Sequence, residues 1–455
     1  MKTNSASAIL GFVLTSTLAQ ATVLPTSPVP SAGLTLTETK TNTLSLSVSN
    51  AGNQVWVIQS SSNLVNWTEV EAVKVHNGEF HRNYGSSVNP NLFFRAFYDP
   101  TRQDIASTRE TALTIPGWPL NYASPVLPAS FFVQPILAQD NMPPNNVTTD
   151  TGATLGRVLF YDKRLSTNQT IACASCHQQA HGFSDPRRFS VGFDGSTGTR
   201  NAMGLSNARW YQRRHFFWDE RANTLEDQVL MPIQNPIEMG MTLEALTNRL
   251  AAEPFYTNLF AAAFGTPEVN TNRISRALAQ FVRSIISVGS QYDMGVTNGF
   301  GNFTPQENLG RQIFLGQVGN ATCAACHGTD NFVPGPAINN NGLEFPYVDR
   351  GLGAITGNPP DNGKFKVPSL RNIELTAPYM HDGRFATLEE VVEFYNSGVV
   401  NNPNLSPPLR NPNGTVRRLN LTAAQKAALV AFLKTLTDTG ITTDPRFTDP
   451  FNYGD

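Results

Sequence analysis

The chain has little charge, few cysteines and no long hydrophobic run beyond its N-terminus. Charged residues make up 15% of the 455 residues, below the roughly 25% of an average soluble domain. The 33 Lys and Arg nearly balance the 35 Asp and Glu, which argues against nucleic acid or an acidic membrane surface as the main partner. No later stretch approaches the about 18 apolar residues of a membrane-spanning helix, so we expect no membrane span.

Cysteine is scarce, and its placement excludes a disulfide framework. All four cysteines belong to two Cys-x-x-Cys-His strings, so no other thiol remains. The chain is still long enough for about three domains, and its 40% of hydrophobic residues, with 28 Phe, can build a core. The 34 Gly and 31 Pro predict long loops between short helices.

The N-terminus has the pattern of an export signal. Lys2 gives a minimal positive region, residues 8–18 are apolar, and Ala-Gln-Ala at 19–21 matches a small-x-small cleavage site. We therefore expect a signal peptide at 1–21 and a mature protein that is periplasmic or secreted. The alternative is that this segment forms a buried first strand or helix.

Residues 30–100 alternate between apolar and polar residues, with Asn, Ser and Gly clusters between the runs. This pattern predicts a small antiparallel β-sandwich without recognisable chemistry. The sequence Gln-Ser-Ser-Ser-Asn-Leu-Val-Asn-Trp at 59–67 makes the segment similar to short bacterial β-sandwich modules, which are generally accessory. The alternating runs are 44–48, 55–58, 70–75 and 92–97.

From about residue 150 the period becomes helical and the sequence repeats itself. Gly-Arg-Val-Leu-Phe at 156–160 precedes the first Cys-x-x-Cys-His string, and Gly-Arg-Gln-Ile-Phe at 310–314 precedes the second. Such self-similarity indicates a duplicated unit. Capping boxes predict three helix starts in this region, at Thr304, Thr387 and Thr422.

The two Cys-x-x-Cys-His strings carry the strongest chemical signal. Two thiols three residues apart can each add to a haem vinyl group, and the adjacent histidine then reaches the iron as proximal ligand. Two strings therefore predict two covalently bound haem c groups. The alternative is one zinc site built from all four cysteines, but the pairs lie far apart and both histidines would be idle. The residues concerned are Cys173, Cys176, His177, Cys323, Cys326 and His327.

Further motifs surround the strings. Phe-Trp-Asp-Glu-Arg-Ala stands at 217–222, Leu-Glu-Asp-Gln-Val at 225–229, Pro-Ile-Glu-Met at 236–239 and Thr-Ala-Pro-Tyr-Met-His-Asp-Gly at 376–383. With these motifs, residues 153–437 resemble the bacterial dihaem cytochrome c peroxidase family, including its MauG-type branch, which oxidises tryptophan in a partner protein.

The resemblance implies a mainly α fold with two cytochrome c-like haem domains, preceded by the β module. We place a peroxidatic domain at 101–295 and an electron-transfer domain at 296–455. The resemblance also implies reduction of hydrogen peroxide at the first haem. The second haem would exchange electrons with a small redox protein, such as a cytochrome or cupredoxin, or with a protein substrate.

In the family, a tryptophan lies between the haems, and a glutamine and a glutamate line the peroxide side of the first haem. These positions correspond to Trp218, Gln228 and Glu238, with Pro232 beside them. Because O–O heterolysis needs a group that moves a proton from the near to the far oxygen, Glu238 is the acid–base candidate. The alternative for Glu238 is a solvated helix end. The family motif has glycine where Glu220 stands here, a departure in the turn after Trp218.

A calcium ion lies between the haem domains of the family. Its ligands there are an asparagine and the backbone carbonyls of a threonine and a proline, which correspond to Asn201, Thr376 and Pro378. Oxygen ligands suit such a hard cation. The alternative for Asn201 is an ordinary turn residue.

The residue opposite the first haem differs from the common pattern. Family peroxidases often close this haem with a histidine in the loop after the first string, where this chain has Phe193. Phenylalanine cannot ligate iron, so we expect an open position. His181 is too close to His177 to reach the opposite face, and we expect His215 to be a supporting or core residue.

The second haem has a different expected ligand. Family peroxidases place methionine fourteen residues after the histidine of His-Asp-Gly, and the MauG branch places tyrosine there. Counting from His381 gives Tyr395. Leu388, Val391, Val392 and Tyr395 share one helical face, which predicts that Tyr395 points inward. A phenolate ligand would favour oxidised iron, whereas the alternative is a core tyrosine.

We therefore expect a dihaem peroxidase-like oxidoreductase of the tyrosine-ligated kind. The surface tryptophan that the MauG branch uses for hole transfer has no counterpart before Cys323, where Gly-Asn-Ala-Thr stands at 319–322. The alternative function is a dihaem electron-transfer or redox-sensing cytochrome without peroxidase turnover, which needs both irons six-coordinate.

Overall fold

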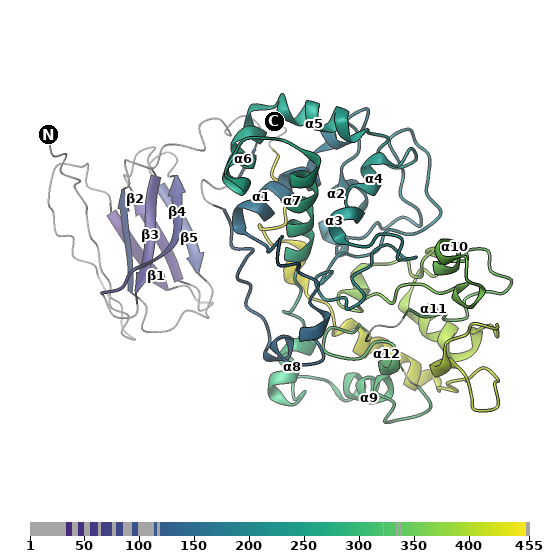
Figure 1. Ribbon diagram of the computed structural model, residues 1–455. Helices are drawn as coiled ribbons and strands as arrows, with labels where there is room; N and C mark the ends of the chain where they lie inside the picture. Colours follow the sequence, from purple (N-terminus) through teal and green to yellow (C-terminus); the bar gives the residue numbers. More distant parts are fainter. Residues whose placement is uncertain are drawn as a thin grey trace, which may run out of the picture. The chain divides into compact units, whose positions relative to one another are not determined.

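The chain divides into two compact units in the computed structural model, Met1–Leu120 with Asn452–Asp455, and Asn121–Phe451 (Figure 1). The export signal predicted at 1–21 lies outside the described residues. The structure describes residues 33–38, 44–49, 55–61, 65–74, 79–84, 93–98, 113–115, 119–321, 323–333, 335 and 338–451.

The described residues of the first unit form two three-stranded antiparallel sheets. Val57 in the central strand of the second sheet is fully buried and pairs with Ala72 on one side and Phe97 on the other. The alternating runs of the sequence are thus strands, whereas face-to-face packing of the two sheets as a sandwich stays a prediction. The sheet orders are β1(Gly33–Glu38), β2(Leu44–Ser49), β5(Glu79–Tyr84), and β4(Thr68–Lys74), β3(Val55–Ser61), β6(Phe93–Tyr98).

The second unit is mainly α, as the resemblance implied. Its helices are short and are joined by long loops (Figure 1). The predicted division at 295/296 falls within α8 and stays a prediction. The helices are α1(Asp150–Tyr161), α2(Cys173–Cys176), α3(Leu225–Gln228), α4(Met231–Gln234), α5(Leu243–Ala251), α6(Pro254–Phe264), α7(Thr271–Ser284), α8(Gln291–Asn298), α9(Pro305–Phe314), α10(Leu352–Thr356), α11(Leu388–Glu393) and α12(Ala423–Lys434).

Two helix pairs repeat the same packing. Helix α1 crosses α7 so closely at Gly156 that a Cβ there would lie 2.0 Å from the carbonyl oxygen of Ala277. Helix α9 crosses α12 in the same way at Gly310, where a Cβ would lie 1.9 Å from the carbonyl oxygen of Ala428. The glycine of each Gly-Arg motif is therefore required by a close helix crossing, and the duplicated unit inferred from the sequence is present in the fold.

The predicted helix starts are confirmed. Thr304, Thr387 and Thr422 each accept a hydrogen bond from the backbone N–H three residues later, and the Glu or Gln at that position accepts one in return. Each such cap stabilises its helix by about 1 kcal/mol.

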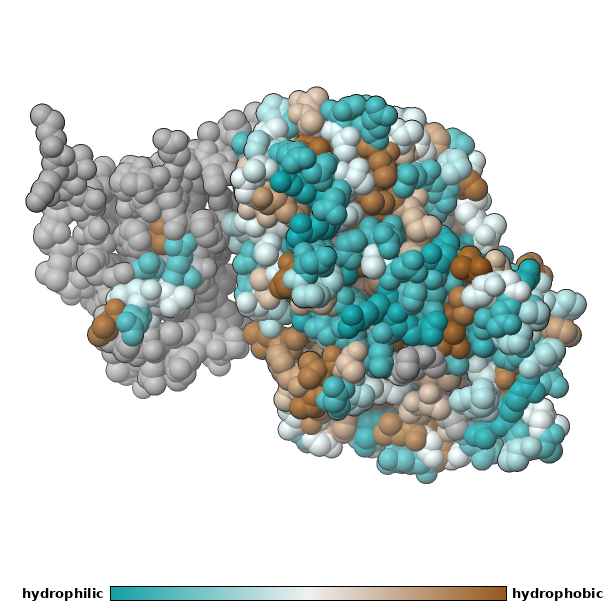
Figure 2. Space-filling view, in the orientation of Figure 1, coloured by the Kyte–Doolittle hydropathy of each residue, from teal (hydrophilic) through white to brown (hydrophobic). Residues whose placement is uncertain are grey.

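The described surface of Asn121–Phe451 is mostly hydrophilic on the face shown in Figure 2, with apolar residues in small groups. Of the helices in the described part of the chain, none is both long and apolar enough to cross a membrane.

Candidate active site

One continuous cavity of about 490 Å³ runs through the second unit. Protein interiors are close-packed with few voids larger than a water molecule, so a cavity of this size is a binding site rather than a packing defect. Both Cys-x-x-Cys-His strings line it, and so does every other site residue predicted from the sequence. The latter are Asn201, Trp218, Gln228, Pro232, Glu238, Thr376, Pro378 and Tyr395.

The first string forms the single turn of α2 and presents His177 to the cavity. The Nδ1 atom of His177 lies 2.9 Å from the carbonyl oxygen of Phe183. Because a carbonyl can only accept, Nδ1 carries the proton and Nε2 keeps its lone pair for a metal. Burial lowers the pKa of His177, which keeps the imidazole neutral. Burial, together with the neighbouring Cys176 and Glu238, raises the pKa of Cys173 to about 12.

The second string repeats this arrangement. Cys323 begins a short 3-10 turn, and His327 follows with Nδ1 at 3.3 Å from the carbonyl oxygen of Phe332. Burial lowers the pKa of His327 to about 4. Each string thus offers two thiols and one neutral imidazole to the same cavity, which fits covalent haem attachment with axial ligation.

The zinc alternative is wrong. All four cysteines lie within the described residues, and none of them forms a disulfide. Nowhere in that part of the chain do three or more His, Cys, Asp or Glu side chains gather as a metal cluster. The two cysteine pairs therefore act separately.

Glu238 lies on the side of the cavity nearest the first string, after the short helix α4. Its carboxyl group is half-buried and accepts a 3.2 Å hydrogen bond from the side-chain amide of Asn235. Burial raises the pKa of Glu238, while the charge of Arg221 opposes this effect. Gln228 ends α3 and Pro232 lies in the first turn of α4, so short consecutive helices bring these residues to one wall of the cavity.

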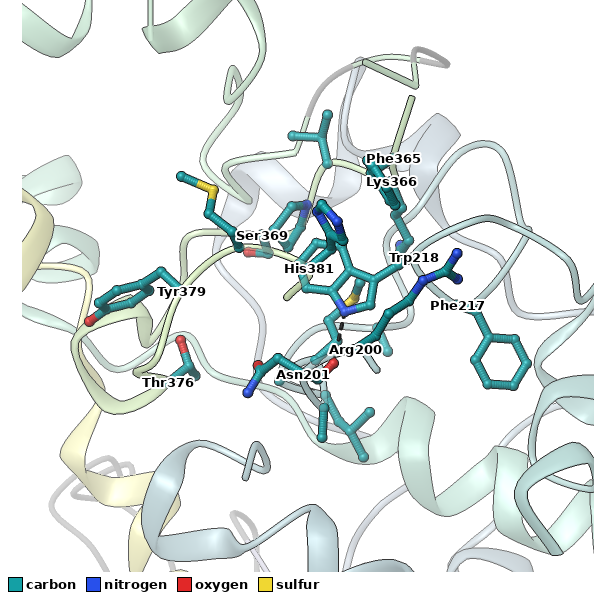
Figure 3. Close-up of a pocket in the computed structure, with 18 of the residues that line it drawn as sticks. Arg200, Asn201, Phe217, Trp218, Phe365, Lys366, Ser369, Thr376, Tyr379 and His381 are labelled. Atoms are coloured by element: carbon teal, nitrogen blue, oxygen red, sulfur yellow. Dashed lines mark hydrogen bonds between the residues drawn. The ribbon is translucent and has the colours of Figure 1, made fainter. Parts of the chain in front are cut away.

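Trp218 lies in a tight loop that Phe216 and Ala222 close with reciprocal backbone hydrogen bonds of 2.9 and 3.4 Å. Its indole N–H donates to the carbonyl oxygen of Asn201 at 2.9 Å, as Figure 3 shows. Its own carbonyl oxygen accepts a 2.8 Å bond from the backbone N–H of Lys366. Because Asn201 follows the first string and Lys366 the second, Trp218 is held by both halves of the unit.

Glu220, the departure from the family motif, occupies the turn after Trp218. Its φ is +57°, the left-handed region that favours glycine. The carboxylate is buried, accepts a hydrogen bond from the Tyr211 hydroxyl and pairs with Arg213 at 2.6 Å. These contacts hold the turn in place without glycine. Sequence reasoning did not identify Tyr211, Arg213 or Lys366, because no motif or spacing links them.

Asn201 is held through both its backbone and its side chain. Its backbone N–H donates to the carbonyl oxygen of His381 at 2.7 Å, and its side-chain NH₂ donates to the carbonyl oxygens of Arg187 and Arg188 at 3.1 and 3.3 Å. The side-chain oxygen is therefore the atom of this amide that could bind a cation. Thr376 and Pro378 line the same cavity, and calcium here stays a prediction.

Tyr395 points into the cavity from a π-helical turn, Phe394–Gly398, that continues α11. The other residues of the predicted inward face, Leu388, Val391 and Val392, line the cavity as well, so the helical phase is confirmed. Burial raises the pKa of Tyr395 to about 12.

A second potential ligand lies beside Tyr395. The side-chain amide of Asn341 donates to the Tyr395 hydroxyl at 3.4 Å and to the sulfur of Met380 at 3.5 Å. Tyrosine and methionine therefore approach the same part of the cavity, and Tyr395 as the ligand remains a prediction.

Phe193 packs outside the cavity. Its backbone N–H donates to the carbonyl oxygen of Glu238 at 3.0 Å. Its ring covers Gly240, where a Cβ would come within 2.5 Å of the ring. Phe193, His181 and His215 are absent from the residues that line the cavity. No imidazole from these positions faces the first string.

Comparisons with known proteins agree with this geometry. A family model described as di-haem cytochrome c peroxidase matches residues 150–299. The cytochrome c551 peroxidase of Nitrosomonas europaea is 36% identical, over 69% of this chain and 86% of its own length. The methylamine utilization protein MauG of Methylorubrum extorquens is 34% identical, over 65% of this chain and 80% of its own.

Solved structures give the same result. The crystal structure of a MauG-like protein associated with microbial copper homeostasis is 36% identical, with a TM-score of 0.61 over 70% of this chain and 98% of that chain. The diheme peroxidase BthA from Burkholderia thailandensis, at 24% identity and a TM-score of 0.56, shares the fold.

Proposed function

The chain belongs to the di-haem cytochrome c peroxidase family and is an oxidoreductase, and on this premise we propose that it reduces hydrogen peroxide at the first haem site and exchanges electrons with a protein partner at the second. Family membership implies two haem c groups. When bound, these groups supply the redox chemistry of O–O cleavage and electron transfer.

Each haem would be held by one string. The thiols of Cys173 and Cys176 would attach the first haem, and His177 would bind its iron. Cys323, Cys326 and His327 would do the same for the second, and Tyr395 would be a further ligand of its iron. The shared lining of one cavity and the protonation of each Nδ1 support these assignments.

The observation that carries the proposal is the half-buried carboxyl group of Glu238 in the cavity that both strings line. Glu238 would be the proton-transfer group. Its carboxylate can take the proton from the near oxygen of peroxide and return it to the far oxygen, which leaves as water. A raised pKa makes this carboxylate a better base and brings its pKa closer to the working pH. Gln228 and Pro232 would shape the same wall and position the peroxide.

Trp218 would couple the two sites. It contacts backbone from both halves through Asn201 and Lys366, and it lines the cavity that both strings share. An aromatic ring at such a place can carry electrons between two redox centres. Calcium at Asn201, Thr376 and Pro378 would fix the same junction.

The protein partner is proposed by class. A small cytochrome or cupredoxin would serve as electron donor, or a protein side chain would be oxidised as in the MauG branch. Export to the periplasm through residues 1–21 would place the enzyme with such partners. The β module, proposed as a sandwich, would be accessory to this activity.

Spectra before and after addition of peroxide test the proposal. Because Phe193 packs on Gly240, we expect the oxidised protein as isolated to contain one high-spin and one low-spin haem by visible and electron paramagnetic resonance spectroscopy. Peroxide should change the spectrum without prior reduction. Two low-spin haems that do not react would instead support the electron-transfer or redox-sensing alternative.

A further inference from the structure

A buried group of polar side chains beside the cavity has no part in the proposed reaction. Tyr211 is 2% exposed and Glu220 is 5% exposed. The Tyr211 hydroxyl donates a hydrogen bond to Oε1 of Glu220. Arg213 binds both oxygens of the same carboxylate, with Nε at 2.8 and 2.7 Å. The Glu220 carboxylate thus accepts the hydrogen bond of Tyr211, and the positive charge of Arg213 balances its negative charge.

Lys366 connects this group to Trp218. Its backbone N–H binds the Trp218 carbonyl oxygen at 2.8 Å, and its Nζ lies 3.0 Å from the centroid of the Tyr211 ring. Tyr211, Trp218 and Lys366 all line the cavity. Tyr211 is therefore adjacent to the segment that we propose couples the two haem sites.

Tyrosine oxidation depends on a proton acceptor. Loss of one electron makes the phenol strongly acidic, so the O–H proton must leave at the same time for a neutral radical to form. A buried phenol cannot release it to water, and a carbonyl oxygen is too weak a base to take it. A hydrogen-bonded carboxylate can accept the proton without movement of either side chain.

Only one cavity tyrosine meets this condition. Among the described residues three tyrosines line the cavity, Tyr211, Tyr379 and Tyr395. The Tyr379 hydroxyl donates to the carbonyl oxygen of Ile373, and Tyr395 lies against the amide of Asn341. Tyr256 does donate to a buried carboxylate, that of Asp162, but it does not line the cavity.

We propose that Tyr211 is a redox-active residue that stores one oxidising equivalent, with Glu220 as its proton acceptor. One electron leaves the Tyr211 ring for the peroxide-oxidised haem centre, which is reduced by one electron. The O–H bond breaks, and the proton moves to Oε1 of Glu220, giving a neutral phenoxyl radical and a neutral carboxylic acid. An electron from the protein partner reverses both changes. The oxidant is hydrogen peroxide, so this inference rests on the proposed function.

Freeze-quench electron paramagnetic resonance tests the proposal on the full-length protein with both haems attached. Mixing with hydrogen peroxide in the absence of a reductant should give an organic radical signal. Incorporation of ring-deuterated tyrosine should narrow that signal, which identifies a tyrosyl radical. Tyr211→Phe should abolish it while both haems still respond to peroxide in the visible spectrum.

Two further variants separate the roles. Glu220→Gln keeps an oxygen for the hydrogen bond but removes the base, and should lower the radical yield by about tenfold or more. Tyr256→Phe is the matched control, because it removes a buried tyrosine–carboxylate pair away from the cavity, and the radical signal should persist. If Glu220→Gln does not incorporate haem, Tyr211→Phe and Tyr256→Phe still show which of the two tyrosines carries the radical.

The outcomes separate this inference from the proposed function. A tyrosyl signal that survives in Tyr211→Phe, or a parent that reacts with peroxide but gives no tyrosyl radical, would overturn the role of Tyr211 alone. A parent whose haems do not react with peroxide would overturn the proposed function, and with it the oxidant that Tyr211 requires.

Discussion

The two halves of the α unit share a scaffold but differ in the other side chains that they present to the cavity. In both, a glycine packs against a helix backbone, and a half-buried histidine donates from Nδ1 to a phenylalanine carbonyl. The first half faces a carboxyl group with a raised pKa, Glu238, whereas the second faces Tyr395 and Met380. In the function that we propose, duplication repeated the string that would attach a haem, and the unduplicated loops would make one site reactive and the other closed.

Of the substitutions that test this difference between the two halves, that of Glu238 should have the largest effect. Glu238→Gln removes the proton-transfer group but keeps the shape of the side chain, so peroxide cleavage should slow by about 10²-fold or more. Stopped-flow kinetics with hydrogen peroxide measures this rate. Glu244→Gln, in the first turn of α5 and outside the cavity lining, is the control and should react as the parent does. A variant at 238 with parental kinetics would remove Glu238 from the mechanism.

The pH dependence should carry the same signature. Burial raises the pKa of Glu238, and its carboxylate is the form that takes the first proton. The rate of peroxide cleavage should therefore reach its maximum above this raised pKa and decrease as the pH drops through it. The decrease should occur at a higher pH than it would for a glutamate with an ordinary pKa. This decrease in rate at low pH should be absent in Glu238→Gln. If the variant still shows it, the decrease is caused by the titration of another group.

The second half can be changed at its proposed ligand. Tyr395→Met should replace phenolate by a neutral thioether, which stabilises ferrous iron and raises the potential of that haem. Redox titration and the low-spin spectrum report the change, while the first haem should stay high-spin. Met380→Leu is the matched control next to the same Asn341 amide. If Tyr395→Met keeps the parental spectrum and potential, or if Met380→Leu changes them, the ligand is Met380 and not Tyr395.

The shared scaffold predicts equal and smaller effects in both halves. Gly156→Ala and Gly310→Ala should each lower the free energy of unfolding by about 1–3 kcal/mol, because the added Cβ forces two helices apart. Denaturant unfolding of the haem-loaded protein measures this loss. Gly301→Ala should be nearly neutral, because a Cβ there meets only one atom, at 3.5 Å. If only one of the two variants loses stability, the two helix crossings are not equivalent.

Much of the site was predictable because its signals are local in the sequence. Haem attachment needs two thiols and a histidine within one turn, so Cys173, Cys176 and His177 can be recognised from their spacing alone. The inward aim of Tyr395 followed from helical phase, although the structure adds a π turn at that point. The close crossing at Gly156 was visible only as a repeated glycine.

The sequence by itself determined the cofactor strings, the capped helices and the inward-facing residues, because each depends on covalent spacing or on the period of one element. Tertiary structure alone decided which distant side chains meet. Tyr211 reaches Glu220 through a left-handed turn, Lys366 joins them from the other half, and Phe193 packs on Gly240. Long loops bring these residues together, and the order of residues along such loops does not reveal where they pack.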